Sequence, residues 1–255
     1  MIRGLNYFRE YFNEFQESYV LIGGVACYLA LEEAGIDFRA TKDLDIVLCA
    51  EAMDVTFVRK FWEFVREGSY EHQEKSTGDK QFYRFSNPEN KEFPFMLELF
   101  SRKPDQLKYE GDGHLTPIPM DENVSSLSAI LLNEDYYQCI HEGKVIIDSI
   151  SILGPSFILP FKARAWLDLT ARKKAGERID SKNIKKHRND IFRIFPLLSP
   201  NQTINISESI KSDLRQFLDA MDREKGINLK DFNIKNLSLS DIVSNIQSIY
   251  ELEEK

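Results

Sequence analysis

Apolar residues recur along this chain with two different periods, and the balance between them changes past its middle. Short apolar runs and alternating stretches predict strands over 20–22, 43–48, 81–87, 93–100, 124–132 and 144–153. Apolar residues spaced three and four apart predict amphipathic helices over 2–17, 25–33, 50–68, 156–175, 182–198, 207–225 and 240–252. We therefore expect an α+β protein, in which a mixed sheet with flanking helices is followed by a helical half.

The dipeptide Gly154-Pro155 separates these two halves. Glycine interrupts regular structure, and proline fits the first turn of a helix because its missing N–H is not needed there. The pattern predicts a sheet domain over 1–154 and a helical domain over 155–255. Pro160 falls inside the first helix of the second domain, where we expect it to be tolerated only near the first turn.

The most informative stretch is 19–48, which reads as strand, glycine turn, helix, loop and strand. A short apolar run ends at Gly23-Gly24, and a helical pattern follows directly. Glycines before a helix can bring backbone N–H groups and the positive end of the helix close to a phosphate. Asp43 and Asp45 then share one face of a strand, because strand side chains alternate. Two close carboxylates favour a cation between them, and Mg²⁺ suits aspartate oxygens. Alone, the pair also fits a solvated turn.

Glu98 is the one acid inside the apolar strand predicted over 93–100. A buried carboxylate without a partner is costly, so it needs a positive partner or a metal ion. The alternative is an edge strand that leaves Glu98 in water.

These residues resemble the signature of the nucleotidyltransferase superfamily typified by DNA polymerase β. Gly23-Gly24-Val25-Ala26, followed by Arg39-x-Thr41-x-Asp43-x-Asp45, looks like the AbiEii-type branch, which includes toxins of toxin–antitoxin pairs. The resemblance implies a nucleotidyltransferase-fold sheet, with Asp43, Asp45 and Glu98 as catalytic metal ligands. Two departures matter: Gly24 replaces the serine that many members use on phosphate, and the gap between Gly24 and Asp43 is longer than in polymerase-type members.

The same resemblance extends into the helical half. It implies that Lys162 contacts nucleotide phosphates, and that Asp190 is a catalytic residue that orients basic groups or assists the acceptor. From the residues themselves, Lys162 could equally be a helix lysine whose stem is covered while its amine reaches water. Asp190 could equally be an i,i+4 partner of Lys186.

The resemblance implies an enzyme that moves an NMP from an NTP to a hydroxyl acceptor with two Mg²⁺ ions. Gly23, Gly24, Thr41 and Lys162 would contact the nucleotide. The acceptor could be RNA such as tRNA, and a partner antitoxin is implied only by the family. A non-catalytic nucleotide- or partner-binding module is one alternative. A transferase acting on a protein or a cationic small molecule is another, with Glu134 and Asp135 as candidate acceptor-pocket acids.

Composition refines this picture without replacing it. The net charge is −8, which does not favour nucleic-acid binding by the whole molecule, but nine Lys or Arg stand against three acids between Arg172 and Arg193. We interpret this basic segment either as an RNA-binding surface or as an ordinary solvated helix face. Three scattered cysteines without ligand spacing, and no apolar run long enough for a membrane span, predict a cytoplasmic protein with reduced thiols.

Overall fold

The computed structural model describes most of the chain, namely residues 2–39, 41–49, 52, 54–71, 82–101, 130–131, 133–224 and 226–253. Most of the strand expected over 124–132 lies outside these residues. Ile130 and Leu131, which do lie within them, are helical, so the strand prediction is wrong there.

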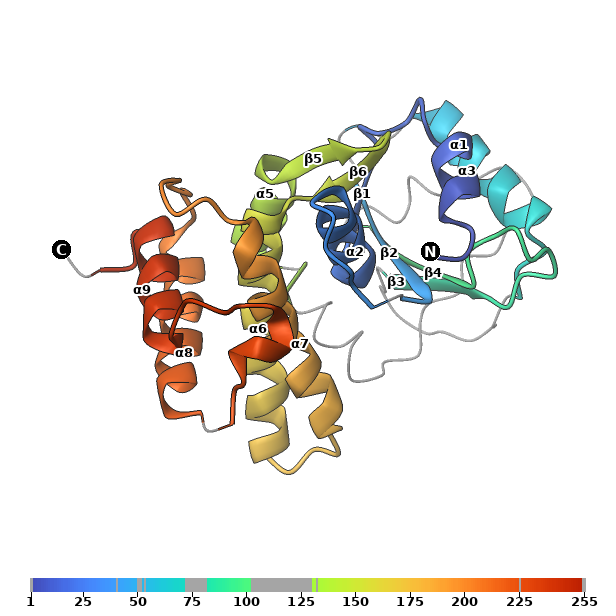
Figure 1. Ribbon diagram of the computed structural model, residues 1–255. Helices are drawn as coiled ribbons and strands as arrows, with labels where there is room; N and C mark the ends of the chain where they lie inside the picture. Colours follow the sequence, from blue (N-terminus) through green and yellow to red (C-terminus); the bar gives the residue numbers. More distant parts are fainter. Residues whose placement is uncertain are drawn as a thin grey trace. The chain divides into compact units, whose positions relative to one another are not determined.

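Six strands form one mixed sheet in the order β3-β4-β2-β1-β6-β5 (Figure 1). Three neighbouring pairs of strands are antiparallel: β3–β4, β1–β2 and β5–β6. The other two pairs, β2–β4 and β1–β6, are parallel. This confirms the α+β class and the mixed sheet. The strands are β1 (Tyr19–Ile22), β2 (Asp43–Leu48), β3 (Phe82–Ser86), β4 (Met96–Ser101), β5 (Lys144–Ile147) and β6 (Ile150–Leu153).

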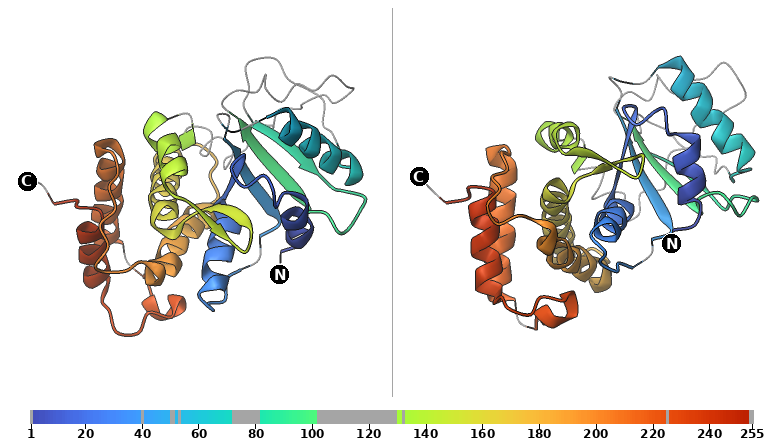
Figure 2. Two further views of the ribbon diagram at one scale, coloured as in Figure 1. Left: turned by 90° about the horizontal axis from the view of Figure 1, so that it is seen from above. Right: turned by 45° about the horizontal axis from the view of Figure 1, so that its top comes forward.

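Helices α1 (Leu5–Tyr11) and α3 (Val55–Glu67) cover one face of this sheet (Figures 1 and 2). Their contacts with the strands are made largely by aromatic side chains. Phe8 of α1 meets Tyr19 of β1 edge to face, with ring centroids 5.3 Å apart, and Phe61 of α3 meets Phe85 of β3 at 5.8 Å. Helix α2 (Gly23–Glu33) follows β1 directly, and every residue from Gly24 to Leu31 is buried.

The described residues form two compact units, one within Met1–Met120 and Lys144–Gly154, the other within Asp121–Gly143 and Pro155–Lys255. The second unit contains α5 (Glu134–Glu142), α6 (Pro155–Lys174), α7 (Ser181–Ile194), α8 (Glu208–Arg223) and α9 (Leu239–Ile249), with short 3₁₀ turns at Phe195–Leu197 and Leu229–Phe232. Together with α1, α2 and α3, the described residues thus hold eight α-helices. None of them is both long and apolar enough to cross a membrane.

Helix α5 lies within the range predicted for the sheet domain, 1–154, but it belongs to the helical unit because of its contacts there. The Tyr136 hydroxyl donates to Asp213 of α8 at 2.8 Å, and Arg164 of α6 contacts the other oxygen of the same carboxylate at 2.9 Å. Burial and the neighbouring Asp213 carboxylate raise the pKa of Tyr136, so its hydroxyl stays a donor. One carboxylate therefore joins three helices of this unit.

Several predicted element boundaries shift in the structure, each for a local reason. The first helix ends at Tyr11, but Phe12 beyond it remains buried among aromatic rings. Helix α3 begins only at Val55 because the Asp54 side chain caps it, accepting from the Phe57 amide at 2.7 Å. Helix α7 ends at Ile194, where Pro196 allows only a 3₁₀ turn. The strand predicted over 144–153 is a hairpin, β5–β6, turning at Asp148 and Ser149.

Pro160 lies in the second turn of α6, later than we expected for a tolerated proline. A residue there would normally donate its N–H to the carbonyl of Ser156, and proline has none to give. The hydroxyl of Tyr250, which directly follows α9, donates to that carbonyl instead. Tyr250 is fully buried, and burial raises its pKa, so the donor is retained. The end of α9 thus completes the hydrogen bonding of α6.

We expect Tyr250→Phe to lower the free energy of unfolding by about 1 kcal/mol, because it leaves a half-buried carbonyl without its donor. The measurement is urea denaturation followed by circular dichroism. In a Pro160→Ala background the new backbone N–H can reach the Ser156 carbonyl, so the same substitution should cost less. An equal cost in both backgrounds would contradict this account of Pro160 and Tyr250.

Candidate functional site

The side chains of β2 divide between a buried face and an acidic face. Leu44, Ile46 and Leu48 are almost fully buried, whereas Asp43 and Asp45 are half-buried. Strand pairing aligns Leu44 with Leu97 of β4, and Leu97 with Phe85 of β3, whose ring packs on α3. Because neighbouring aligned residues share a face, the two aspartates lie on the face of the sheet opposite α1 and α3. They belong to a central strand, so the solvated-turn interpretation is wrong.

Glu98 lies directly beside Asp45 in the register of the sheet. The parallel pairing of β2 and β4 aligns Asp45 with Glu98, and the antiparallel pairing of β4 and β3 aligns Glu98 with Arg84. The structure therefore places Asp43, Asp45 and Glu98 on one face of the sheet. We call these three residues the acidic row; the guanidinium of Arg84 lies at its end. β4 is flanked by strands on both sides, so the edge-strand interpretation of Glu98 is wrong as well.

Arg84 holds the carboxylate of Glu98 through a single oxygen. The Nε atom of Arg84 donates to Oε1 at 2.9 Å, and its NH2 atom donates to the same oxygen at 2.5 Å. The two side chains are 24% and 13% exposed, so water screens this pair only in part. Within the part of the chain that the structure describes, the second oxygen, Oε2, accepts no hydrogen bond.

Asp45 packs against the start of α2. Gly23 there has a φ of +66°, and a Cβ atom built on it would lie 2.0 Å from Oδ2 of Asp45. Only glycine adopts this backbone conformation freely, and only glycine leaves room for the carboxylate. The first glycine of the pair is therefore required both by the strand-to-helix turn and by Asp45.

Gly24 and Thr41 form the next contact of this site. A Cβ atom on Gly24 would lie 3.1 Å from the Thr41 hydroxyl oxygen, so the loop before β2 packs closely on the first turn of α2. The N-cap residue of α2 is Ile22, whose side chain cannot accept a hydrogen bond. The first amides of a helix have no partner within it, so the chain builds a positive helix end beside Asp45 and Thr41.

The chemistry of the acidic row suits a hard divalent cation, since all its ligands would be carboxylate oxygens. Among the described residues, no three His, Cys, Asp or Glu side chains are grouped so that they could hold a metal ion as they stand. Arg84 ties one oxygen of the third acid, Glu98, to β3.

Lys162 and Asp190 are brought together inside the helical unit. Lys162 of α6 is 5% exposed, Asp190 of α7 is 0% exposed, and the Lys162 amine lies 3.1 Å from Oδ2 of Asp190. Arg193 lies 3.5 Å from the other oxygen. Lys162 is therefore not a lysine that reaches water along its helix. The structure pairs these residues with each other, and assembles the acidic row separately in the sheet unit.

The basic segment between Arg172 and Arg193 divides into internal pairs and an exposed set. Arg172 binds Glu177 at 2.8 Å, Arg188 binds Glu224 at 2.8 Å, and Arg193 contacts Asp190. The glutamate also raises the pKa of Arg172. The exposed cations lie at the end of α6, in the following turn and in the first turns of α7; they are Lys173, Lys174, Arg178, Lys182, Lys185 and Lys186.

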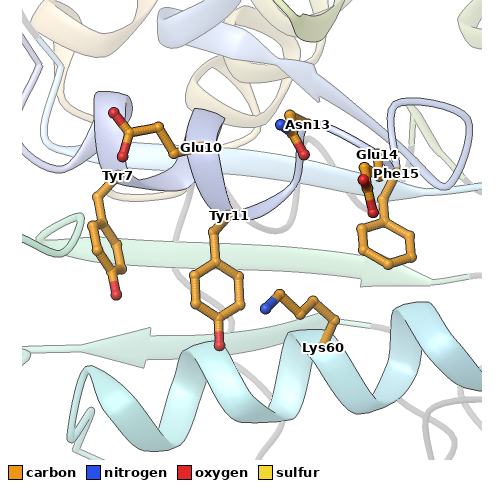
Figure 3. Close-up of a pocket in the computed structure, with 7 residues that line it drawn as sticks. All are labelled: Tyr7, Glu10, Tyr11, Asn13, Glu14, Phe15 and Lys60. Atoms are coloured by element: carbon orange, nitrogen blue, oxygen red, sulfur yellow. The ribbon is translucent and has the colours of Figure 1, made fainter.

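A pocket of about 370 Å³ lies between α1 and α3, on the face of the sheet opposite the acids (Figure 3). Three of its lining residues, Tyr7, Tyr11 and Lys60, make polar contacts that join the two helices. Tyr7 and Tyr11 both donate to Glu67, at 3.2 and 3.0 Å, and the Lys60 amine lies 3.9 Å from the centre of the Tyr11 ring. Burial and Glu67 raise the pKa of both tyrosines. We interpret these contacts as structural: they hold α1 against α3.

Sequence reasoning missed Arg84. A signal was present, because Arg84 is the one basic residue in the strand predicted over 81–87, just as Glu98 is the one acid in its partner. The two could be matched only with the register of the β3–β4 hairpin.

Comparison with known proteins gives no further guide to the site. Neither a scan against models of protein families nor a search of curated proteins returns a match.

Gly23→Ala and Gly35→Ala form a matched pair that tests the packing of Asp45. Both glycines have positive φ, +66° and +71°, but a Cβ atom on Gly35 meets nothing within 4 Å. We expect each substitution to cost about 1–2 kcal/mol of unfolding free energy from backbone strain. Only Gly23→Ala should also displace the Asp45 carboxylate, detected as a changed carboxyl chemical shift in NMR spectra. Equal spectra for the two variants would contradict the contact.

Lys162→Ala should destabilise the protein by about 2–4 kcal/mol, because Asp190 then keeps a buried charge with less compensation. The double variant Lys162→Met/Asp190→Leu removes both charges and should cost less than the single one. Chemical denaturation measures both. A double variant that is destabilised as much as Lys162→Ala, or more, would show that the two residues do not act as a pair.

Proposed function

We propose that this protein is a nucleotidyltransferase that moves an NMP from an NTP to a hydroxyl group of an acceptor. The observation that carries the proposal is the packing of Asp45 against Gly23, with Glu98 aligned beside it. These two contacts bring a glycine turn at the start of a helix together with acids on two adjacent strands. A glycine turn alone, or a pair of acids alone, would not support it.

In this proposal the acidic row holds divalent cations through the carboxylates of Asp43, Asp45 and Glu98. Their oxygens fit Mg²⁺ in kind, and Oε2 of Glu98, which accepts no hydrogen bond from the described residues, leaves one acceptor position available. When bound, Mg²⁺ would neutralise phosphate charge and stabilise the attacking and leaving oxygens. Resemblance to nucleotidyltransferases implies two such ions.

The remaining groups of the sheet unit would position the nucleotide. Gly23 and Gly24 lack side chains, so phosphate oxygens can approach the backbone at the start of α2, where the helix end is positive. The Thr41 hydroxyl beside Gly24 would add a side-chain donor. The acceptor hydroxyl would attack the α-phosphorus, the bond to the β-phosphate would break, and pyrophosphate would leave. Glu98 would help to activate the acceptor hydroxyl by accepting its proton.

Lys162 and Asp190 enter this proposal with altered roles. Since Asp190 is fully buried beside Lys162, its simplest role is to fix the position of the lysine amine. That role differs from assisting the acceptor. Contact between Lys162 and nucleotide phosphates stays a prediction from the resemblance.

For the acceptor, the exposed lysines of the α6–α7 turn favour RNA over a cationic small molecule. Phosphate backbones bind clustered lysine and arginine, and six such residues are exposed there. The acids suggested for a cationic acceptor lie instead at the first turn of α5, where Asp135 accepts a hydrogen bond from Ser209. A toxin activity with a partner antitoxin stays a prediction from the resemblance.

The proposal is tested by incubating the protein with each NTP, labelled at the α-phosphate, together with Mg²⁺ and cell RNA or protein. We expect RNA to become labelled. Asp45→Asn should lower the rate by roughly a factor of 100 or more, equivalent to about 3 kcal/mol of transition-state stabilisation.

Asp54→Asn is the matched control for this experiment. It makes the same acid-to-amide change at the cap of α3, where asparagine also caps well, so activity should be retained. In a parallel reaction with NTP labelled at the γ-phosphate, transfer of the label would indicate a kinase. NTP binding with no transfer to any polymer or small molecule would favour a non-catalytic nucleotide-binding module.

A further inference from the structure

The row across β2, β4 and β3 carries the charges minus, minus and plus. Asp45 and Glu98 are aligned on adjacent parallel strands, and Arg84 is aligned with Glu98 on the far side. Like charges at aligned positions of neighbouring strands destabilise a sheet. Arg84 supplies the opposite charge, and it does so through two N–H groups that converge on one oxygen.

The same pairing limits Glu98 as a ligand of a shared cation site. With Oε1 held by Arg84, Oε2 is the oxygen of Glu98 left to face a cation beside Asp43 and Asp45, and that cation would share the carboxylate with a guanidinium. A guanidinium and a divalent cation repel each other, so both cannot be held closely by one carboxylate without a large cost.

We propose that Arg84 is the resident counter-ion of the acidic row, which a divalent cation must displace from Glu98 in order to load. Arg84 then sets the cation concentration at which the site fills. This inference rests on the proposed function, because it takes the acidic row to be the cation site. It adds Arg84, and a competition between its guanidinium and the divalent cation for Glu98, neither of which the nucleotidyltransferase proposal requires.

The test is direct binding of Mn²⁺, followed by the electron paramagnetic resonance signal of the free ion, with no NTP present. Arg84→Ala should bind Mn²⁺ roughly tenfold more tightly than the unmodified protein, because the guanidinium that competes with Mn²⁺ for Glu98 through charge-assisted hydrogen bonds is lost. Arg84→Gln keeps an amide donor without the charge, so it should show the same direction of change if the alanine variant folds poorly. Arg84→Lys keeps the charge and should stay close to the unmodified protein.

Two controls separate competition for Glu98 from a general charge effect. Arg9→Ala removes a cation of similar exposure that pairs with Asp148, outside the row, and should leave Mn²⁺ affinity within about twofold. In a Glu98→Gln background, Arg84→Ala should no longer tighten binding. Thermal unfolding adds a second readout: the Arg84→Ala protein should be less stable without cation and should gain more from Mn²⁺.

The outcomes distinguish this inference from the proposed function. If the protein binds Mn²⁺ through Glu98 but neither Arg84→Ala nor Arg84→Gln tightens binding, the counter-ion role is wrong and the cation site stands. Weaker binding in both variants would make Arg84 a positioning residue for Glu98 instead, and would overturn the competition. If no variant binds Mn²⁺ at millimolar concentration, both the cation site and the inference fail.

Discussion

The two-residue period of β2 is the constraint on which the sheet unit depends. One strand supplies both the buried apolar residues Leu44, Ile46 and Leu48 and the acids Asp43 and Asp45, on opposite faces. A slip of one residue in its pairing would bury both acids and expose the leucines, so the hydrophobic core fixes where the carboxylates lie. Pairing to both neighbouring strands holds this register. The pairing that builds the core therefore also sets the face on which the carboxylates lie.

This arrangement concentrates negative charge, and the surrounding residues limit its cost. Gly23 lets the Asp45 carboxylate lie against the start of a helix, where the partial positive charge of the backbone is favourable. Arg84 offsets the charge of Glu98 on the next strand. In the helical unit Asp190 is accommodated differently, by full burial between two cations. Both units thus keep acids at low solvent exposure by building the counter-charge into a neighbouring element.

Sequence patterns were sufficient for the parts of this protein that depend on local periodicity. The strand carrying Asp43 and Asp45, the helix after Gly23-Gly24 and the lone acid at Glu98 all follow from alternation and helical spacing. What failed depended on contacts distant in sequence. Arg84 could not be matched to Glu98 without the hairpin register, and the ion pair of Lys162 with Asp190 joins residues that are 28 positions apart. Helix α5 was also missed, because its short acidic and aromatic segment is held by Asp213, which lies on a later helix.

The hydrogen bond that Tyr250 gives to α6 has a consequence for the order in which the protein can fold during synthesis. The sheet is complete once Leu153 has been made, since β6 is its last strand. Helix α6 follows immediately, yet the donor for its Ser156 carbonyl arrives almost 100 residues later. At about 5–20 residues per second, the ribosome needs several seconds to supply it. We expect the sheet unit to fold while the helical unit is still being translated, and the helix that carries Lys162 to become fully stable only when the last helix has been made.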